Sequence, residues 1–307
     1  TRRSRVATSP ITCLTTVVRP PTTTVVITGH ANGALSVWED EDEEVIWVER
    51  GEDALRDVTG CYLPSSSSSS PNVGSLTIVT VSSTGTRHHT ASQKSPPHLL
   101  DARTSTTCLF YTVRDKCYVA VGVARPAVID LYSVSDDDNI KKMASLTGHE
   151  DWITSLSFHP TSHYLASGSQ DCRIRLWHCH DDETASSEAV LIGHDDAVTD
   201  VSWYDSRADD DDDKSLLSSS LDKSILLWRE DHSDGVWTPT LRVGSAGGVL
   251  GGSLGSSLLG FVRVSSFRDV IVGMGYGGVI YLWQSADGRL RDCLTGHFEG
   301  VVDMSWE

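Results

Sequence analysis

Basic residues are few in this sequence, where 25 Lys and Arg stand against 42 Asp and Glu, for a formal net charge of −17. A surface that binds nucleic acid gains affinity by neutralising phosphates with Lys and Arg. We therefore expect no direct nucleic-acid binding from the bulk surface of this chain. The sequence also lacks a long apolar run. Its uncharged stretch at residues 243–262 is about half Gly and Ser, which predicts a loop between strands and not a membrane span.

Cysteine is scarce as well. The seven cysteines are scattered, with no Cys-x-x-Cys pair, and no Asn-x-Ser/Thr glycosylation site is present. An odd number of widely spaced cysteines does not fit a disulfide framework and favours a reducing compartment. We expect the protein in the cytoplasm, with the nucleus as a second location.

Two segments of the sequence repeat each other. Residues 147–177 read TGHEDWITSLSFHPTSHYLASGSQDCRIRLW, and residues 192–228 read IGHDDAVTDVSWYDSRADDDDDKSLLSSSLDKSILLW. Each begins with Gly-His, continues through an alternating apolar strand and a small-residue strand, and closes with x-Asp-x-x-Ile-x-Leu-Trp. Short strands separated by turns, with no helical period between them, predict an all-β fold.

The closing strand recurs along the chain, each time ending in an aromatic residue. These residues are Trp38, Tyr132, Trp177, Trp228 and Trp283. The last four are 45 to 55 residues apart, and the 94-residue interval before them leaves room for one more unit, which we place around residues 75–83. The period matches four-stranded β-propeller blades of about 40–45 residues. We predict about six blades of a seven-bladed ring.

The intervals that exceed one blade contain polar or low-complexity insertions. They are residues 65–70, 87–103, 209–213 and 244–257, and we expect all four in surface loops. The chain starts at Thr1 and ends at Glu307, just after a further unit opens with TGHFEGVVDMSW. We therefore expect a fragment.

The repeats resemble the WD40 family, in which a His, a Ser or Thr, an Asp and a Trp form hydrogen bonds within each blade. Two repeats contain all four residue types at the family's positions. They are His149, Ser167, Asp171 and Trp177 in one repeat, and His194, Ser218, Asp222 and Trp228 in the next. We expect residues 1–307 to form a single WD40 β-propeller, with further blades and a second propeller outside this chain.

The other repeats depart from this pattern when residues are counted back from the closing aromatic. The Ser and Asp positions are taken by Thr28 and Asn32, by Gly122 and Pro126, and by Gly273 and Gly277. We expect these blades to be held together by packing alone.

A Ser, a His and an Asp in one repeat could also form a catalytic triad. The structural interpretation is favoured, because the set recurs, whereas a triad is normally made once, beside an oxyanion hole. Buried polar groups must also be paired, and this set pairs an imidazole, a hydroxyl, a carboxylate and an indole N–H. We predict no catalytic residues.

Residues 273–278 match the dinucleotide-binding pattern G-x-G-x-x-G through Gly273, Gly275 and Gly278. That fingerprint needs a helix directly after the glycines, whose N-terminus receives the pyrophosphate. The sequence VIYLW follows instead and predicts a strand. The glycines are more typical of a tight turn between strands, and we predict no cofactor.

Two histidine-rich segments could hold a metal ion, at residues 178–183 and at His88-His89. Adjacent ligands in an extended segment point in alternating directions, and no second ligand pair at the spacing of a structural zinc site lies nearby. A solvated loop is the favoured interpretation for both. The acidic run at residues 209–213 is at most a weak cation site. We predict no metal site.

Four tryptophans lie outside the closing position. Trp203 and Trp306 occupy the same place in their strands, V-S-W and M-S-W, which favours core packing. Trp152 follows the Gly148-His149 pair and is a candidate for partner contact at a blade rim, where aromatic anchors mark interfaces.

Residues from about 216 to 306 carry a more specific resemblance. They contain SSSLDKSILLWREDHSDGVWTPTLRVGSAGG, then LLGF, GMGYGGVIYLW and TGHFEGVVDMSW. The elements Asp-Gly-Val-Trp, Arg-Val-Gly-x-x-Gly-Gly and Leu-Gly-Phe are not generic to WD40 blades, and the stretch resembles the family of second subunits of the Elongator complex. The resemblance implies a non-catalytic scaffold in a complex that modifies the wobble uridine of tRNAs. Its partners would be the largest scaffold subunit and the catalytic subunit.

Two other classes of function stay open at this point. The chain could be a different WD40 adaptor, for example in iron–sulfur protein assembly or in substrate choice by a ubiquitin ligase, and the identity of its partners would discriminate. It could also be an enzyme that uses a propeller channel, which would require polar residues converging at the funnel.

Overall fold

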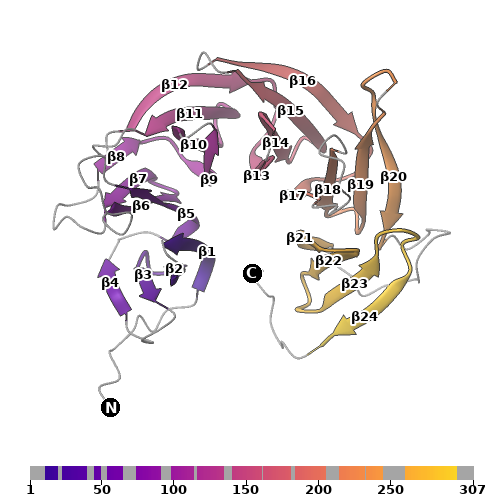
Figure 1. Cartoon of the computed structure of the whole chain (residues 1–307), viewed down its shortest axis with the longest axis horizontal. Helices are drawn as coiled ribbons and strands as arrows, with labels where there is room; N and C mark the ends of the chain where they lie inside the picture. Colours follow the sequence, from indigo (N-terminus) through magenta and orange to yellow (C-terminus); the bar gives the residue numbers. More distant parts are fainter. Residues whose placement is uncertain are drawn as a thin grey trace. The chain divides into compact units, whose positions relative to one another are not determined.

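The structure is a computed structural model. It describes residues 11–19, 23–39, 45–49, 54–64, 74–90, 98–113, 116–134, 140–160, 162–180, 184–204, 214–231, 233–244 and 260–295. The regular structure in these ranges is β-strand, grouped into six sheets of four antiparallel strands each. Within every sheet the strands follow one another in chain order, as in propeller blades (Figure 1). We number the sheets blade 1 to blade 6. The described residues contain no helix with the length and apolar character that a membrane span requires.

The chain divides into two compact units, one ending at Thr147 and the other beginning at Gly148. The first unit contains blades 1 to 3. Their strands are β1 (Ile11–Arg19), β2 (Thr23–His30), β3 (Leu35–Glu39) and β4 (Val45–Glu49) in blade 1; β5 (Leu55–Pro64), β6 (Gly74–Ser82), β7 (Gly85–Thr90) and β8 (His98–Asp101) in blade 2; and β9 (Ser105–Val113), β10 (Lys116–Val123), β11 (Val128–Val134) and β12 (Ile140–Thr147) in blade 3.

The second unit contains blades 4 to 6. Their strands are β13 (Ile153–Phe158), β14 (Tyr164–Ser169), β15 (Arg173–Cys179) and β16 (Ala185–Ile192) in blade 4; β17 (Val198–Trp203), β18 (Ser215–Ser220), β19 (Ile225–Glu230) and β20 (Trp237–Val243) in blade 5; and β21 (Phe261–Phe267), β22 (Val270–Gly275), β23 (Ile280–Gln284) and β24 (Leu290–Leu294) in blade 6.

The strands follow from period-two alternation of apolar residues. In β15, for example, Ile174 and Leu176 are buried, while Arg173 and Arg175 between them are only half-buried. Successive side chains of a strand point to opposite faces, so such a pattern buries one face against a neighbouring sheet. Within the second unit, side chains from blades 4 and 5 form one apolar cluster, which includes Trp203 and Trp237. The prediction that Trp203 packs in the core is confirmed, whereas Trp306 lies outside the described residues.

The predicted all-β fold with six propeller blades is confirmed. Each closing aromatic lies in the third strand of its blade, and residues 75–83 fall mostly in β6, the second strand of blade 2. The number of blades in the complete ring stays a prediction. The insertions at 65–70 and 209–213 lie outside the described residues, as do all but the first residue of 244–257 and of the opening unit at 295–306.

The expectation of a surface loop at residues 87–103 was wrong. This segment contains most of β7 and all of β8, the outer half of blade 2. His88 and His89 are buried in β7, and Thr86 pairs with Asp101 of β8. The polar composition of the segment therefore gave a wrong indication of a loop, where the structure has two strands.

Candidate functional site

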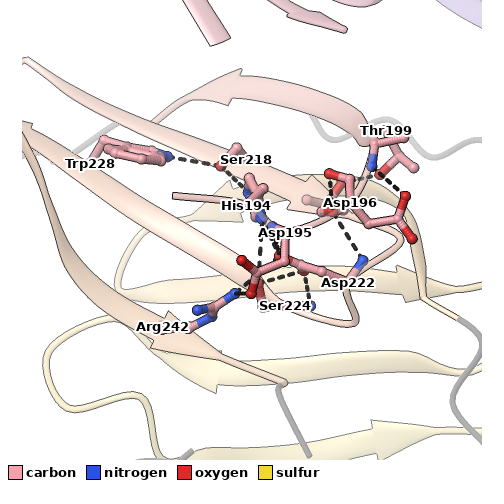
Figure 2. Close-up of polar contacts among 12 residues, drawn as sticks. His194, Asp195, Asp196, Thr199, Ser218, Asp222, Ser224, Trp228 and Arg242 are labelled. Carbon is pink, nitrogen blue, oxygen red and sulfur yellow. Dashed lines mark hydrogen bonds and ion pairs between the residues drawn. The ribbon is translucent and has the colours of Figure 1, made fainter. Parts of the chain in front are cut away.

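The polar network of blade 5 joins four residues that come from separate elements (Figure 2). His194 lies in the loop after β16, Ser218 in β18, Asp222 in the turn between β18 and β19, and Trp228 in β19. His194 Nδ1 is 2.8 Å from Asp222 Oδ2, and His194 Nε2 is 2.8 Å from Ser218 Oγ. Trp228 Nε1 donates a hydrogen bond to the same Ser218 Oγ at 2.8 Å. The structure therefore brings all four residues into one chain of hydrogen bonds.

The chemistry of the side chains determines which atoms donate in this series of hydrogen bonds. The Asp222 carboxylate can only accept, so His194 Nδ1 carries the proton and donates it to the carboxylate. His194 Nε2 is then an acceptor and takes the hydroxyl hydrogen of Ser218, whose oxygen lone pair accepts from the Trp228 indole. Every polar group of the four side chains has a partner, which is the condition for burying them.

Blade 4 repeats this network with the same geometry. His149 Nδ1 is 2.8 Å from Asp171 Oδ2, and His149 Nε2 is 2.8 Å from Ser167 Oγ. Trp177 Nε1 donates to Ser167 Oγ at 2.9 Å. The same four residue types thus fold into the same arrangement twice, although the His lies 18 residues before the serine in blade 4 and 24 residues before it in blade 5.

Each Asp of the two networks also holds its turn. Asp171 Oδ1 accepts from the backbone N of Arg173 at 2.9 Å, and its Oδ2 accepts from the backbone N of Glu150 at 3.0 Å. Cys172, between Asp171 and Arg173, has a φ of 66°, a left-handed conformation that is rare outside glycine. The carboxylate therefore ties the imidazole loop to a strained turn.

These contacts change the acidity of both carboxyls. Burial alone would raise the pKa of Asp171, but the hydrogen bonds from His149 and from the Glu150 backbone N–H outweigh it and lower that pKa to about 2. Burial opposes in the same way at Asp222, where the hydrogen bonds from His194 and from Ser224 nevertheless hold the pKa well below its usual 3.8. Both carboxyls are ionised at neutral pH.

The two networks do not fit a catalytic triad. Ser167 and Ser218 are both 0% exposed, and each oxygen already accepts the indole N–H of its blade. A nucleophilic serine must meet a substrate at its oxygen, beside donors for the oxyanion. What this arrangement does chemically is hold four buried polar groups in mutual contact.

Blade 1 contains a polar network that counting from Trp38 does not find. His30, at the end of β2, is buried, and its Nε2 lies 3.2 Å from both Thr28 Oγ1 and Ser36 Oγ. Asn32 keeps the turn role of the Asp, since its Oδ1 accepts from the backbone N of Ala34 at 3.1 Å. The expectation of packing alone is wrong for this blade, because the imidazole comes from within the blade and not from the preceding loop.

In blade 2 a histidine takes the place of the closing tryptophan. Ile78 pairs with His89 in the strand register, just as Leu165 pairs with Trp177 in blade 4. His89 Nε2 lies 2.9 Å from Thr80 Oγ1, which corresponds to the contact between Trp177 and its serine. The expected solvated loop at His88-His89 was thus wrong, and His89 is a buried residue of the blade.

Blade 3 is also more than a packed sheet. The register pairs Val119 with Tyr132 and Val121 with Asp130, so Val121, and not Gly122, occupies the serine position. Asp130 is fully buried and forms ion pairs with Arg103 and with Lys142, whose Nζ is 2.8 Å away. A buried carboxylate of this kind requires such partners.

Blade 6 has no such pairing at its closing tryptophan. Gly273 takes the position that a serine or threonine occupies in blades 1, 2, 4 and 5, and Trp283 Nε1 is buried with no hydrogen-bond partner among the described residues. A Cβ on Gly273 would lie 2.4 Å from Ile225 Cδ1, so the close approach of blade 5 requires glycine here. Gly278 sits in the turn before β23 with a φ of 78°. Gly278 therefore serves a turn between strands, as predicted, whereas Gly273 and Gly275 lie in β22, and a strand follows the turn.

Carboxylates on the first strands connect neighbouring blades, and we did not anticipate them. Asp57 Oδ2 accepts from Thr107 Oγ1 at 2.7 Å, between blades 2 and 3. Asp200 accepts from Ser155 Oγ at 2.6 Å and from the backbone N of Val264 at 3.0 Å, and so links blade 5 to both of its neighbours. The repeated Asp-Val at 57–58 and 200–201 was the available signal.

The remaining candidates are placed as follows. Trp152 is half-buried in the loop between β12 and β13, next to the exposed Glu150 and Asp151, and its role in partner contact stays a prediction. His178 lies in β15 and not in a loop, with His180 directly after the strand. Burial, followed by the nearby His180, lowers the pKa of His178. In the described part of the chain, no three His, Cys, Asp or Glu side chains converge as a metal-binding group.

Comparison with known proteins agrees with this geometry. A family model described as WD domain, G-beta repeat matches residues 140–178 and 185–229, which include the two complete networks. A Mus musculus protein named Elongator complex protein 2 is 31% identical over 219 residues, which cover 58% of this chain and 25% of the relative. Proteins of the same name from Dictyostelium discoideum and Saccharomyces cerevisiae are each 28% identical, over 61% and 63% of this chain.

The chain spans only 25% to 30% of the length of these three relatives. Proteins from animals, a plant and fungi that match this chain all carry the same name. The chain thus contains two segments that match WD40 repeats, and relatives of it across eukaryotes are named Elongator complex protein 2.

Proposed function

We propose that this chain is a non-catalytic scaffold part of the Elongator complex and supports the modification of tRNA wobble uridines. In this proposal it bridges the largest scaffold subunit and the catalytic subunit, in the cytoplasm and also in the nucleus. The observation that carries the proposal is the shared name of its relatives across animals, a plant, fungi and Dictyostelium.

The buried polar groups support a scaffold role over a catalytic one. The Ser-His-Asp sets of blades 4 and 5 are engaged in structural hydrogen bonds, with their serines fully buried. Carboxylates such as Asp200 link one blade to the next. In this proposal, blades that are held to their neighbours within a unit in this way present their loops as a surface for other proteins.

The charge supports an indirect role toward tRNA. A net charge of −17 repels a phosphate backbone, so in this proposal the RNA is bound by other subunits. Trp152 is the side chain that we propose for contact with a partner, because it is an aromatic residue half-exposed in a loop.

The test is affinity purification of the tagged full-length protein from its own cells, followed by mass spectrometry. We expect the largest scaffold subunit and the catalytic subunit of Elongator in near-equal amounts with the bait. Their absence, with another stable set recovered, would overturn the proposal and favour a different WD40 adaptor, for example in iron–sulfur protein assembly or a ubiquitin ligase.

A pair of variants tests the proposed contact separately. Trp152→Ala should reduce the recovery of at least one Elongator subunit several-fold without changing the melting temperature of the protein. Tyr276→Ala is the matched control, because Tyr276 is an exposed aromatic in a turn of blade 6. Equal recovery with both variants would remove Trp152 from the interface and leave the assignment to the complex intact.

A further inference from the structure

Two histidines at the end of β15 share one side of the chain. His178 pairs with Ser186 of β16, and His180 lies two residues further on, where its backbone N donates to the carbonyl of Thr184 at 2.8 Å. Residues two apart in an extended segment project to the same side. Cys179, between them, is buried on the other side, at 8% exposure. The same alternation of side chains that places adjacent residues on opposite sides therefore places these two imidazoles on one side.

The two rings face each other through the same type of nitrogen. His178 Nδ1 lies 3.1 Å from His180 Nδ1, and the ring centroids are 4.5 Å apart. Two imidazole nitrogens at about 2.05 Å from one ion are separated by about 3.3 Å in tetrahedral geometry. In square-planar geometry the separation is about 2.9 Å. The observed distance falls between these values, so the two nitrogens lie at the separation that one shared ion requires.

Neighbouring side chains hold both rings in this orientation. His180 Nε2 lies 3.0 Å from Ser186 Oγ. When His180 Nε2–H donates to this hydroxyl, the Nδ1 lone pair is left pointing at His178, as in metal sites where the second ring nitrogen of a ligand is hydrogen-bonded. On the other side His178 packs against Tyr164, with ring centroids 5.1 Å apart. His180 is exposed, so an ion can approach from solvent.

We propose that His178 and His180 form a binding site for a divalent transition-metal ion such as Zn²⁺ or Cu²⁺. Imidazole ligands favour these ions over Mg²⁺ and Ca²⁺, which prefer oxygen. The described residues supply two ligands, and water completes the coordination. Without the ion, one of the two Nδ1 atoms carries a proton and donates it to the other; on binding, that ring changes to its Nε2–H tautomer and both Nδ1 lone pairs face the metal.

The test is isothermal titration calorimetry of the untagged, chelator-treated full chain at pH 7.5 with ZnCl₂, and with MgCl₂ as the control ion. We expect Zn²⁺ to bind and Mg²⁺ not to bind. His178→Gln and His180→Gln should each weaken the Zn²⁺ affinity at least about tenfold, and Ser186→Ala should weaken it by about tenfold. His163→Gln is the matched control, because its ring lies 6.2 Å from that of His178 and should change the affinity less than about twofold.

Absence of Zn²⁺ binding by the unaltered chain would overturn the proposal, and so would unchanged affinity in both glutamine variants. If a variant does not fold, electron paramagnetic resonance of the unaltered chain with one equivalent of Cu²⁺ still tests whether both imidazoles bind the ion. Hyperfine splitting from two imidazole nitrogens is expected, and a spectrum without it would overturn the site. Neither outcome bears on the scaffold role proposed above.

Discussion

Arg242 Nη2 lies 3.0 Å from Asp222 Oδ2, the same oxygen that accepts a hydrogen bond from His194 (Figure 2). Among the described residues of blade 4, no cation takes this place, because the strand register puts Val190 where blade 5 has Arg242. Asp171 is therefore held by His149 and backbone N–H groups. Asp222 also accepts from Ser224 Oγ at 2.7 Å, at the position where blade 4 has Arg173. Beyond this hydroxyl, the two networks differ by one exposed arginine. This difference separates the contribution of the buried network from that of the surface ion pair.

We predict that Asp171→Ala and Asp222→Ala each lower the free energy of unfolding by about 1–3 kcal/mol. Each substitution leaves a buried imidazole N–H and backbone N–H groups without an acceptor, and such groups retain the cost of their desolvation. Arg242→Val copies blade 4 and should cost at most about 1 kcal/mol, because its side chain is 40% exposed and exposed ion pairs contribute little. Equilibrium unfolding in urea measures all three.

The control for this series is Glu150→Gln. The Glu150 side chain forms an exposed ion pair with Arg173 at 3.3 Å and does not contact Asp171, and its backbone N–H is unchanged in the variant. Its substitution should leave the unfolding midpoint nearly unchanged. If Asp171→Ala behaves like Glu150→Gln, the network of blade 4 does not stabilise the fold.

The acidity of Asp171 predicts a loss of stability in acid. Its pKa is about 2 in the folded chain, against an ordinary value of 3.8, so the unfolded chain binds this proton more readily than the folded chain does. The stabilisation is therefore fully present above about pH 5 and is lost as the pH falls from about 4 to 2. Asp222, with its pKa lowered in the same direction, adds to this loss. Unfolding free energies at a series of pH values should fall through this window.

Asp171→Asn isolates the contribution of the carboxyl, because it removes the titrating group and keeps the size of the side chain. The variant should be less stable than the unaltered chain at pH 6, and the difference between the two should narrow toward pH 2. A constant difference across this range would show that the Asp171 carboxyl is not coupled to folding.

The networks of blades 4 and 5 could be predicted because the offset between serine and tryptophan is constant. Ser167 and Trp177 are ten residues apart, as are Ser218 and Trp228, and in both blades the turn between the strands has the same length. The offset changes where the turn changes. The equivalent residues are nine apart in blade 2 and eleven apart in blade 3, so counting residues missed His89 and selected Gly122 in place of Val121.

Contacts between strands that are far apart in sequence were beyond this kind of counting. The hydrogen bond from Ser155 to Asp200 joins residues that are 45 positions apart in the sequence. The sequence around either residue does not indicate which residue it contacts.

Residues 178–183 were considered as a metal site, but a solvated loop was favoured because adjacent side chains in an extended segment diverge. In a strand, the side chains of adjacent residues point to opposite faces, but those of residues two apart point to the same face. We had also expected a loop at the end of β15.

The closing tryptophans of blades 5 and 6 offer a matched comparison. Trp228 and Trp283 are both almost fully buried, but Trp228 Nε1 donates to Ser218 Oγ at 2.8 Å, whereas Trp283 Nε1 has no partner among the described residues. Phenylalanine removes the indole N–H in either case and keeps an aromatic ring. At Trp228 this substitution breaks the hydrogen bond to Ser218. At Trp283 it removes a buried N–H that has no hydrogen bond to a described residue. We therefore expect Trp228→Phe to lower the free energy of unfolding by about 1 kcal/mol more than Trp283→Phe does. Urea unfolding of the two variants under identical conditions measures the difference, and equal or reversed effects would show that the bond to Ser218 adds nothing beyond packing.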